Sequence, residues 1–195
     1  IARHGEVAHY SHQGFKNIES KKPIDENTIF RIYSMTKPIT SVAIMMLYEK
    51  GLLRLEHELF RYLPEFANTE IWESGDLNNY KTRSVDNPIL IRDLLTHTAG
   101  FTYDFMLGHP AIGLYKKNGL DTYIDPEEKK EMNLEKFTKK LSSLPLLFNP
   151  GEKWHYSCAT DVLGRLVEVV SGQLLDDFLK ENIFVPLEMI DTGFY

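Results

Sequence analysis

The chain has 195 residues, of which 43% are hydrophobic and 26% are charged, and its formal net charge is −6. This composition is ordinary for a globular protein, and the length is enough to bury a core as one domain. Lysines occur in pairs beside acidic residues rather than in a basic stripe, so we expect no nucleic-acid partner. The longest apolar run, around residues 42–47, is too short for a membrane span, and the single cysteine, Cys158, excludes an internal disulfide.

Short strands and one long helix are predicted for the first fifty residues. Residues 1–15 are typical of a β-hairpin with His4-Gly5 at its turn, and residues 28–33 of a short strand or extended segment. A helix is predicted over residues 35–50, because apolar side chains recur there at steps of three and four: Ile39, Val42, Ala43, Met46 and Leu47.

The middle of the chain has weaker periodicity. Residues 52–63 predict a loop with a short helix, and the polar residues 67–87 predict a surface excursion. Ile91–Leu95 is predicted to be a short helix. Residues 101–132 are the least regular, since glycines and prolines interrupt a segment rich in tyrosine and phenylalanine.

Two amphipathic helices dominate the last third of the chain. One begins at about Leu134, and the other is predicted to have Ser157 as its N-cap and Gly172 as its stop. A further helix is predicted over residues 174–182, and residues 191–195 are typical of the entry to another strand. Strands at the start, helices in the middle and a returning strand predict an α/β (α+β) fold, in which a helical insertion interrupts a sheet.

Ser34 and Lys37 form a Ser-x-x-Lys motif where the extended segment meets the first helix. Residues three apart share one face of a helix, so the two side chains can meet. A serine hydroxyl is a poor nucleophile unless a neighbouring group takes its proton, and a neutral lysine amine can do so. The motif therefore indicates a Ser/Lys hydrolase with Ser34 as nucleophile and Lys37 as its base.

The same motif also has a plain structural interpretation. Serine is a common N-cap, lysine is a common surface residue, and a Ser-x-x-Lys string is expected about once by chance in a chain of this length. Its place at a strand-to-helix junction favours the catalytic interpretation, and so does a second segment far downstream.

That second segment contains Tyr156, which follows a Pro-Gly turn and precedes a predicted helix. A tyrosine held rigidly in this way can point into a cleft, where it can act as general base in acylation and as general acid toward the leaving group. The alternative is a packed tyrosine whose hydroxyl has a hydrogen-bond partner. The presence of Ser34 and Lys37 favours the catalytic alternative.

Together these segments resemble the serine β-lactamase and penicillin-binding-protein superfamily, and most of all its class C-like branch, which includes the family VIII carboxylesterases. The resemblance covers nearly the whole chain and is weakest across residues 67–87 and 101–132. The matching stretches are Ser-Met-Thr-Lys-Pro-Ile-Thr-Ser at 34–41, Tyr-Glu-Lys-Gly at 48–51, Tyr-Leu-Pro-Glu-Phe at 62–66, Ile-Arg-Asp-Leu-Leu-Thr-His-Thr-Ala-Gly at 91–100, Pro-Gly at 150–151, Trp-His-Tyr-Ser at 154–157 and Asp-Thr-Gly-Phe at 191–194.

The resemblance implies roles for three residues. Ser34 would be the acylated nucleophile, Lys37 its proton partner, and Tyr156 the general base and acid. The oxyanion hole of the family uses the backbone N–H of the nucleophile, here Ser34, and a second N–H from a later strand, which together stabilise the developing oxyanion. No metal or organic cofactor is implied.

The resemblance also implies a fold and a domain organisation. The fold would be β-lactamase/transpeptidase-like, a mixed sheet flanked by helices with a helical subdomain that carries the Tyr156 segment. Residues 1–195 would be one partial β-lactamase-related domain, incomplete at its C-terminal end. Within it, residues 1–66 would hold the N-terminal strands and the nucleophile helix, residues 67–182 a mainly helical subdomain, and residues 183–195 a return toward the sheet. Since the chain begins with Ile1 rather than methionine, we also expect it to be trimmed at its start.

Two departures from the family pattern bear on the function. The third family motif, a Lys-Thr-Gly or His-x-Gly strand, is not found after Tyr156, so we expect a fragment that lacks the second oxyanion donor. Lactamases of this branch usually have Tyr-x-Asn, and here Cys158 occupies the third position. That asparagine helps to hold the amide side chain of a lactam, so its replacement favours an esterase or acyltransferase. We expect Cys158 itself to be a small packing residue rather than a nucleophile.

Four further residues are candidates for substrate binding. Tyr103 and Phe105 could line an apolar acyl pocket, although they could equally pack the subdomain. His155 and Ser157 flank Tyr156 and could touch substrate, although His155 could equally be a solvent-exposed side chain. For His97 we expect a structural hydrogen bond rather than catalysis.

The sequence therefore predicts a serine hydrolase that forms an acyl-enzyme on Ser34, first of all a carboxylesterase acting on small acyl esters. The alternatives with related chemistry are a β-lactamase, a D,D-peptidase and an acyltransferase, and all of these act on small-molecule esters or amides. An alternative from another class is a non-catalytic binding protein that uses the same fold.

Overall fold

The computed structural model describes residues 1–122 and 132–194. By its internal packing the chain divides into two compact units, Ile1–Ser34 and Met35–Tyr195.

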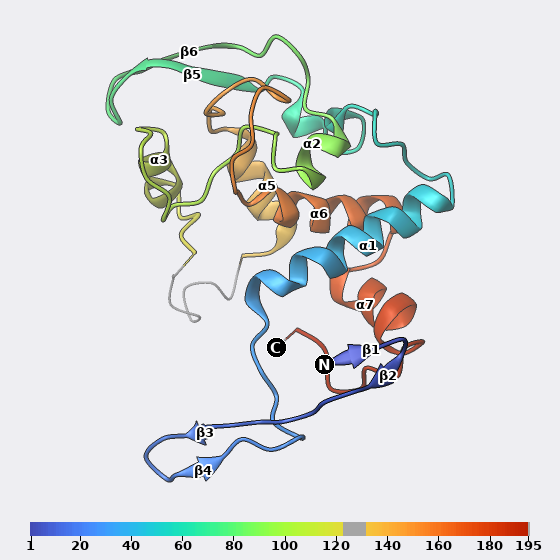
Figure 1. Cartoon of the computed structure of the whole chain (residues 1–195). Helices are drawn as coiled ribbons and strands as arrows, with labels where there is room; N and C mark the ends of the chain where they lie inside the picture. Colours follow the sequence, from blue (N-terminus) through green and yellow to red (C-terminus); the bar gives the residue numbers. More distant parts are fainter. Residues whose placement is uncertain (123–131, 195) are drawn as a thin grey trace. The chain divides into compact units, whose positions relative to one another are not determined.

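The first unit consists of two short hairpins and an extended segment (Figure 1). Strands β1 (Ala2–Arg3) and β2 (Glu6–Val7) pair antiparallel, which confirms the predicted hairpin, although its strands are shorter than expected. Both residues of its turn have positive φ, 53° at His4 and 81° at Gly5, as tight two-residue hairpin turns require.

A second hairpin of this unit was not predicted from the sequence. It pairs β3 (Phe15–Asn17) with β4 (Lys22–Pro23), and the side chain of Lys16 forms an ion pair with Asp25 beside it. The predicted strand or extended segment at 28–33 carries no strand in the structure, and its end belongs to the 3₁₀ turn η1 (Tyr33–Met35), which leads directly into α1.

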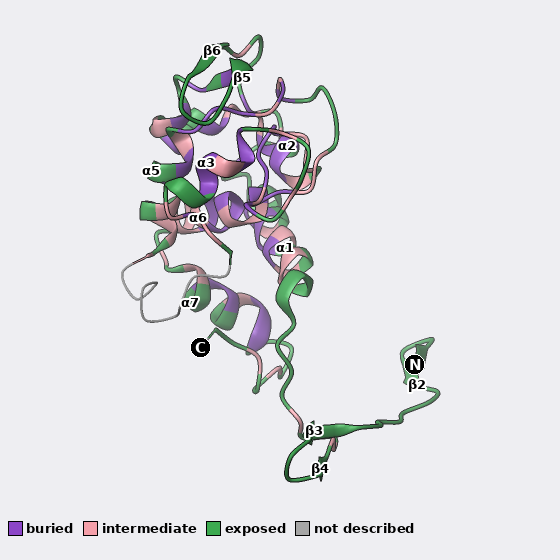
Figure 2. Ribbon diagram, turned by 90° about the vertical axis from the view of Figure 1, so that its left-hand side faces the viewer, coloured by how far each residue is buried: buried purple, intermediate pink, exposed green. Residues whose placement is uncertain are grey.

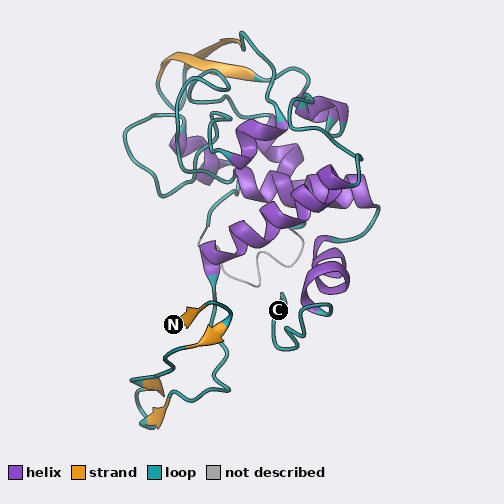
Figure 3. Ribbon diagram, turned by 45° about the vertical axis from the view of Figure 1, so that its right-hand side comes forward, coloured by secondary structure: helices purple, strands orange, loops and turns teal. Residues whose placement is uncertain are grey.

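The second unit is built around helix α6 (Ala159–Ser171), which packs against α1 (Thr36–Glu49), α2 (Ile91–Leu95) and α5 (Leu134–Ser142). Figure 3 shows these helices gathered together, and Figure 2 shows the buried residues concentrated in and around α6. Helix α6 presents buried side chains at the three- and four-residue steps of one helical face: Ala159, Val162, Leu163, Leu166 and Val167. Buried apolar surface around this helix is thus the core of the unit.

Local sequence signals account for the bounds of these helices. The predicted helices at 35–50 and 91–95 are confirmed as α1 and α2. Helix α5 begins at Leu134, where the side chain of Asn133 caps it by accepting the Lys136 amide at 2.8 Å. Helix α6 ends at Gly172, which takes the left-handed conformation with φ 75°.

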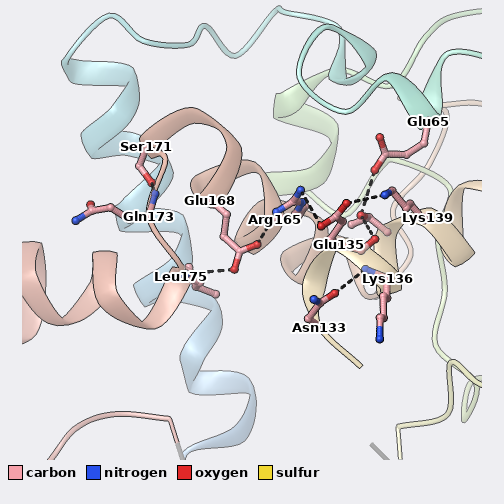
Figure 4. Close-up of polar contacts among 11 residues, drawn as sticks. Glu65, Asn133, Glu135, Lys136, Lys139, Arg165, Glu168, Ser171, Gln173 and Leu175 are labelled. Atoms are coloured by element: carbon pink, nitrogen blue, oxygen red, sulfur yellow. Dashed lines mark hydrogen bonds and ion pairs between the residues drawn. The ribbon is translucent and has the colours of Figure 1, made fainter. Parts of the chain in front are cut away.

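The helix predicted over 174–182 is confirmed in its position but is irregular. It consists of α7 (Leu175–Leu179) followed by a π-helical turn, η4 (Lys180–Phe184). A polar network fixes the start of α7, as Figure 4 shows. Arg165 on α6 bridges Glu168 at 3.0 Å and Glu135 of α5 at 3.7 Å, and the other carboxylate oxygen of Glu168 accepts the Leu175 amide at 3.3 Å.

The segment 67–87, predicted as a surface excursion, contains a β-hairpin that was not predicted from the sequence. Strand β5 (Glu70–Gly75) pairs with β6 (Tyr80–Ser84), and only Ile71 and Trp72 of the two strands are buried. The hairpin is joined to the core because the Leu146 amide donates to Glu70 at 2.8 Å and the Trp72 amide donates to Leu146 at 2.9 Å. With so few buried positions, its alternation is too weak to predict strands.

The remaining elements in the described part of this unit are short. The 3₁₀ turn η2 (Leu59–Arg61) confirms the short helical piece predicted within residues 52–63, and the 3₁₀ turn η3 (Pro64–Phe66) follows it. Helix α3 (Ile112–Lys117) lies within the segment that was expected to be irregular. Residues 191–194, all described, form a turn and coil and not the predicted strand, since no described segment supplies a pairing partner there.

The mixture of helices with small sheets confirms the predicted α/β class. Within residues 1–122 and 132–194, the structure has three sheets, and each is antiparallel and two-stranded. No helix in the described ranges is both long and apolar enough to cross a bilayer.

Gly100 lies where the backbone of residues 97–102 comes close to that of residues 146–148. Its φ is 87°, and its carbonyl accepts the Leu147 amide at 2.9 Å. A Cβ at this position would lie 2.5 Å from the carbonyl oxygen of Phe148, far inside van der Waals contact. Only glycine therefore fits between the 97–102 segment and the 146–148 segment.

We expect Gly100→Ala to lower the free energy of unfolding by about 3 kcal/mol, the sum of left-handed backbone strain and a backbone clash. Gly108→Ala is the matched control, because Gly108 has φ 95° but open space where its Cβ would lie, and it should cost only about 1–2 kcal/mol. Urea denaturation of both variants measures the difference. Equal losses would show that the close approach at Gly100 is not tight.

Candidate active site

The two residues of the Ser-x-x-Lys motif lie in consecutive elements. Ser34 is the middle residue of η1 and the last residue of the first unit, and Lys37 is the second residue of α1 in the second unit. The residue before Ser34, Tyr33, has φ 44°, which is rare for an aromatic residue. Unusual backbone conformations of this kind cluster at functional positions.

Within the second unit, the Lys37 ammonium lies against two tyrosine rings. Its Nζ is 4.7 Å from the ring centre of Tyr156 and 5.4 Å from that of Tyr103, and the two rings are 5.5 Å apart. These are cation–π distances. The structure therefore brings together three sequence-selected residues that come from α1, from the 101–105 segment and from the segment before α6.

Phe105 extends this aromatic group outward. Its ring is stacked on Tyr103 with centres 4.9 Å apart, and the residue is 45% exposed. Burial raises the pKa of the Tyr103 phenol, and the charge of Asp161 adds to the effect. Tyr103 is therefore a neutral phenol at physiological pH.

A cavity of about 630 Å³ adjoins Tyr103. Its apolar lining includes Leu120, Leu134 and Phe137, and charged side chains stand among them, such as Lys140 and Asp161. A cavity with apolar walls and a few polar groups is the usual form of a small-molecule site. Tyr103 belongs both to this cavity and to the aromatic group around Lys37.

The segment that carries Tyr156 is held by backbone hydrogen bonds to residues 97–102. Three donations make this connection: Gly151 to Thr98 at 2.9 Å, His155 to His97 at 2.9 Å and Cys158 to Thr102 at 3.3 Å. Because they lie on both sides of Tyr156, they fix its backbone relative to the 97–102 segment.

The side chains of His155 and Ser157 both form hydrogen bonds within the protein. Nε2 of His155 is 2.9 Å from Oγ1 of Thr102, and burial lowers the pKa of the His155 imidazole. Ser157 is only 1% exposed, and its Oγ lies 3.3 Å from Nδ1 of His97 and accepts the Ala159 amide at 3.4 Å. Both side chains therefore help to hold the segment that carries Tyr156.

The N-cap of α6 is Cys158, one residue later than predicted.

Cys158 is a packing residue, as predicted. It is 2% exposed within the apolar core, and burial raises the pKa of its thiol well above the ordinary value. The reactive thiolate is therefore suppressed at neutral pH.

His97 has the structural hydrogen bond that was expected, but it also contacts the aromatic group. Its ring centre is 5.1 Å from that of Tyr156 and 6.3 Å from that of Trp154. Burial lowers the pKa of the His97 imidazole, and the positive charge of Lys37 lowers it further. The contacts of His97 and Trp154 with Tyr156 were not predicted from the sequence, although Trp154 is only two residues before Tyr156.

Across residues 1–122 and 132–194, no group of three or more His, Cys, Asp or Glu side chains is arranged to hold a metal ion.

Comparison with known proteins identifies the family. The family model described as Beta-lactamase matches residues 1–195, so the chain belongs to the β-lactamase family. Esterase EstB of Burkholderia gladioli is 37% identical over 194 residues, which are 100% of this chain and 45% of EstB. The chain thus spans less than half the length of that curated relative.

Solved structures agree with this assignment. EstCE1, a hydrolase with promiscuous acyltransferase activity, has a TM-score of 0.79 and 34% identity, over 96% of this chain and 45% of that one. The penicillin-binding protein from Bacillus halodurans has a TM-score of 0.65 and 27% identity, over 95% of this chain and 48% of that one. The fold is therefore of the β-lactamase and penicillin-binding-protein type, with esterase and acyltransferase relatives.

We expect acid to destabilise the protein partly through His97. Its folded-state pKa is below the unfolded value of about 6.5, so its contribution to stability is fully present above pH 6.5 and is lost as the pH falls through the folded pKa. The free energy of unfolding, measured by urea denaturation, should therefore differ less between pH 7 and pH 5 in His97→Asn than in the wild type. His12→Asn, at an exposed histidine, is the control for charge number. An equal loss of unfolding free energy in His97→Asn and the wild type would show that His97 does not contribute to the acid sensitivity.

Proposed function

We propose that the protein is a serine hydrolase that forms an acyl-enzyme on Ser34, and that it acts as a carboxylesterase on small acyl esters. The observation that carries the proposal is the position of the Lys37 ammonium 4.7 Å from the Tyr156 ring centre, in a chain of the β-lactamase family. The Ser-x-x-Lys spacing supports Ser34 as the nucleophile, because the lysine follows it by one helical turn.

In the proposed reaction Ser34 Oγ attacks the ester carbonyl carbon. The hydroxyl proton passes to the Lys37–Tyr156 pair as the C–O bond forms and the carbonyl oxygen becomes an oxyanion. When the oxyanion collapses, the ester C–O bond breaks and the alcohol leaves with that proton. Water then attacks the acyl-enzyme, the pair takes its proton and returns it to Ser34, and the carboxylic acid is released.

The aromatic residues around Lys37 support the proposal that the acyl group of the substrate is apolar. Tyr103 and Phe105 present stacked rings, and Tyr103 also lines the cavity with Leu120 and Phe137. Such walls bind a hydrocarbon chain by removing it from water. In this proposal Tyr103 and Phe105 contact substrate, whereas His155 and Ser157 hold Tyr156 in place.

Acyl transfer is the nearest alternative. The same acyl-enzyme can be attacked by an alcohol instead of water, and EstCE1 is a hydrolase that also transfers acyl groups. The β-lactamase and D,D-peptidase alternatives are less well supported, because Cys158 is a buried packing residue where lactamases of this branch have an amide side chain. A non-catalytic binding protein is the alternative from another class, and it predicts no covalent adduct.

Labelling with a fluorophosphonate tests the nucleophile. We expect the intact mass to increase by one adduct in the wild type and in Ser41→Ala, and not to increase in Ser34→Ala. Ser41 is a matched control because it is a serine of α1, the helix that follows Ser34 in the chain. An adduct that persists in Ser34→Ala would assign the nucleophile to another residue.

Tyr156→Phe tests the proton-transfer role separately from packing. Phenylalanine keeps the ring against Lys37 but removes the hydroxyl, so we expect p-nitrophenyl butyrate turnover to fall about 10²–10⁴-fold with the melting temperature nearly unchanged. Tyr48→Phe, at an exposed tyrosine of α1, is the control. Equal activity of the two variants would exclude a role for the Tyr156 hydroxyl in proton transfer.

A further inference from the structure

One residue, His97, holds both chain neighbours of Tyr156. The His97 carbonyl accepts the His155 amide at 2.9 Å, and Nδ1 of His97 lies 3.3 Å from Oγ of Ser157. Its imidazole ring also contacts the Tyr156 ring itself, with centres 5.1 Å apart. Backbone, neighbouring side chain and ring are therefore all fixed relative to the same histidine.

The backbone of His97 is itself constrained. Its φ is 55°, in the left-handed region that non-glycine residues seldom adopt. The conformation is held by surrounding hydrogen bonds, since the Thr98 amide donates to Asp93 at 2.8 Å and the Thr98 carbonyl accepts the Gly151 amide at 2.9 Å. A strained residue persists only where its surroundings determine it in this way.

We propose that His97 is a positioning residue, whose imidazole orients Tyr156 toward Lys37 through Ser157 and through direct ring contact. This inference rests on the proposed function, in which Tyr156 transfers the proton. His97 makes no contact with the reacting atoms in this role, and its effect is on how often the Tyr156 hydroxyl and the Lys37 side-chain nitrogen are correctly placed.

The protonation state of His97 fits a purely positioning role. A neutral imidazole can accept the Ser157 hydroxyl hydrogen at Nδ1, and Ser157 Oγ can then still accept the Ala159 amide. Burial and the nearby Lys37 charge both favour that neutral form. A protonated His97 would instead place a second cation beside the Lys37 ammonium.

Three variants separate the imidazole from the backbone. His97→Gly removes the side chain while keeping a residue that adopts φ 55° without strain. His97→Asn keeps a hydrogen-bonding group near Nδ1 and tolerates the left-handed region, so it is the rescuing variant. His57→Gly is the matched control, because Nδ1 of His57 also bonds a hydroxyl, that of Tyr62 at 2.7 Å.

The direct readout is the nuclear Overhauser effect between the Lys37 side-chain methylene protons and the Tyr156 ring protons. We expect it in the wild type, in His57→Gly and in His97→Asn, and we expect its loss or strong weakening in His97→Gly. An undiminished effect in His97→Gly would overturn the inference whether or not the protein is an esterase.

The second readout is the rate of fluorophosphonate acylation. It should fall about tenfold to a hundredfold in His97→Gly, the size expected for misplacement of a reacting group, and should recover in His97→Asn. A His97→Gly rate equal to that of His57→Gly, or an equally slow His97→Asn, would overturn the positioning role. Absence of Ser34-dependent acylation in the wild type would instead overturn the proposed function.

Discussion

The hydrogen bonds between residues 97–102 and residues 147–158 are the constraint on which the site depends. Four backbone donations, from Leu147, Gly151, His155 and Cys158, join segments that are far apart in the chain. Each contributes a net of only about 1 kcal/mol, but losing one leaves a polar group without its partner at a further cost. Because the bonds lie on both sides of Tyr156, they determine where its ring lies relative to α1.

The consequence is a lysine held against aromatic rings at the start of a helix. Lys37 is fixed by α1, whose buried face packs on α6, and α6 begins three residues after Tyr156. The packing of α1 against α6 therefore determines the positions of both Lys37 and Tyr156, the two partners of the proposed proton transfer. Tyr103 connects this pair to the neighbouring cavity, so the proposed proton transfer and the proposed binding of an apolar group meet at one neutral phenol.

Helix bounds could be predicted from the sequence because their signals are local. Periodicity predicted α1, α2 and α5, and a terminal glycine predicted the end of α6. The β5–β6 hairpin was missed because only Ile71 and Trp72 face the core. His97 and Ser157 are 60 positions apart, and no local pattern encodes their contact. The pairing of Lys37 with Tyr156 could be expected only from family resemblance, since strand and helix periods say nothing about side chains 119 residues apart.

The central claim is that an ester acylates Ser34. The most direct test is to quench the reaction with p-nitrophenyl butyrate during the first turnover and to locate the acyl group by tandem mass spectrometry of the proteolytic peptides. We expect a butyryl group on the peptide that contains Ser34, with fragment ions that assign it to that residue. A butyryl group confined to another residue, or p-nitrophenol release with no acylated peptide, would contradict it.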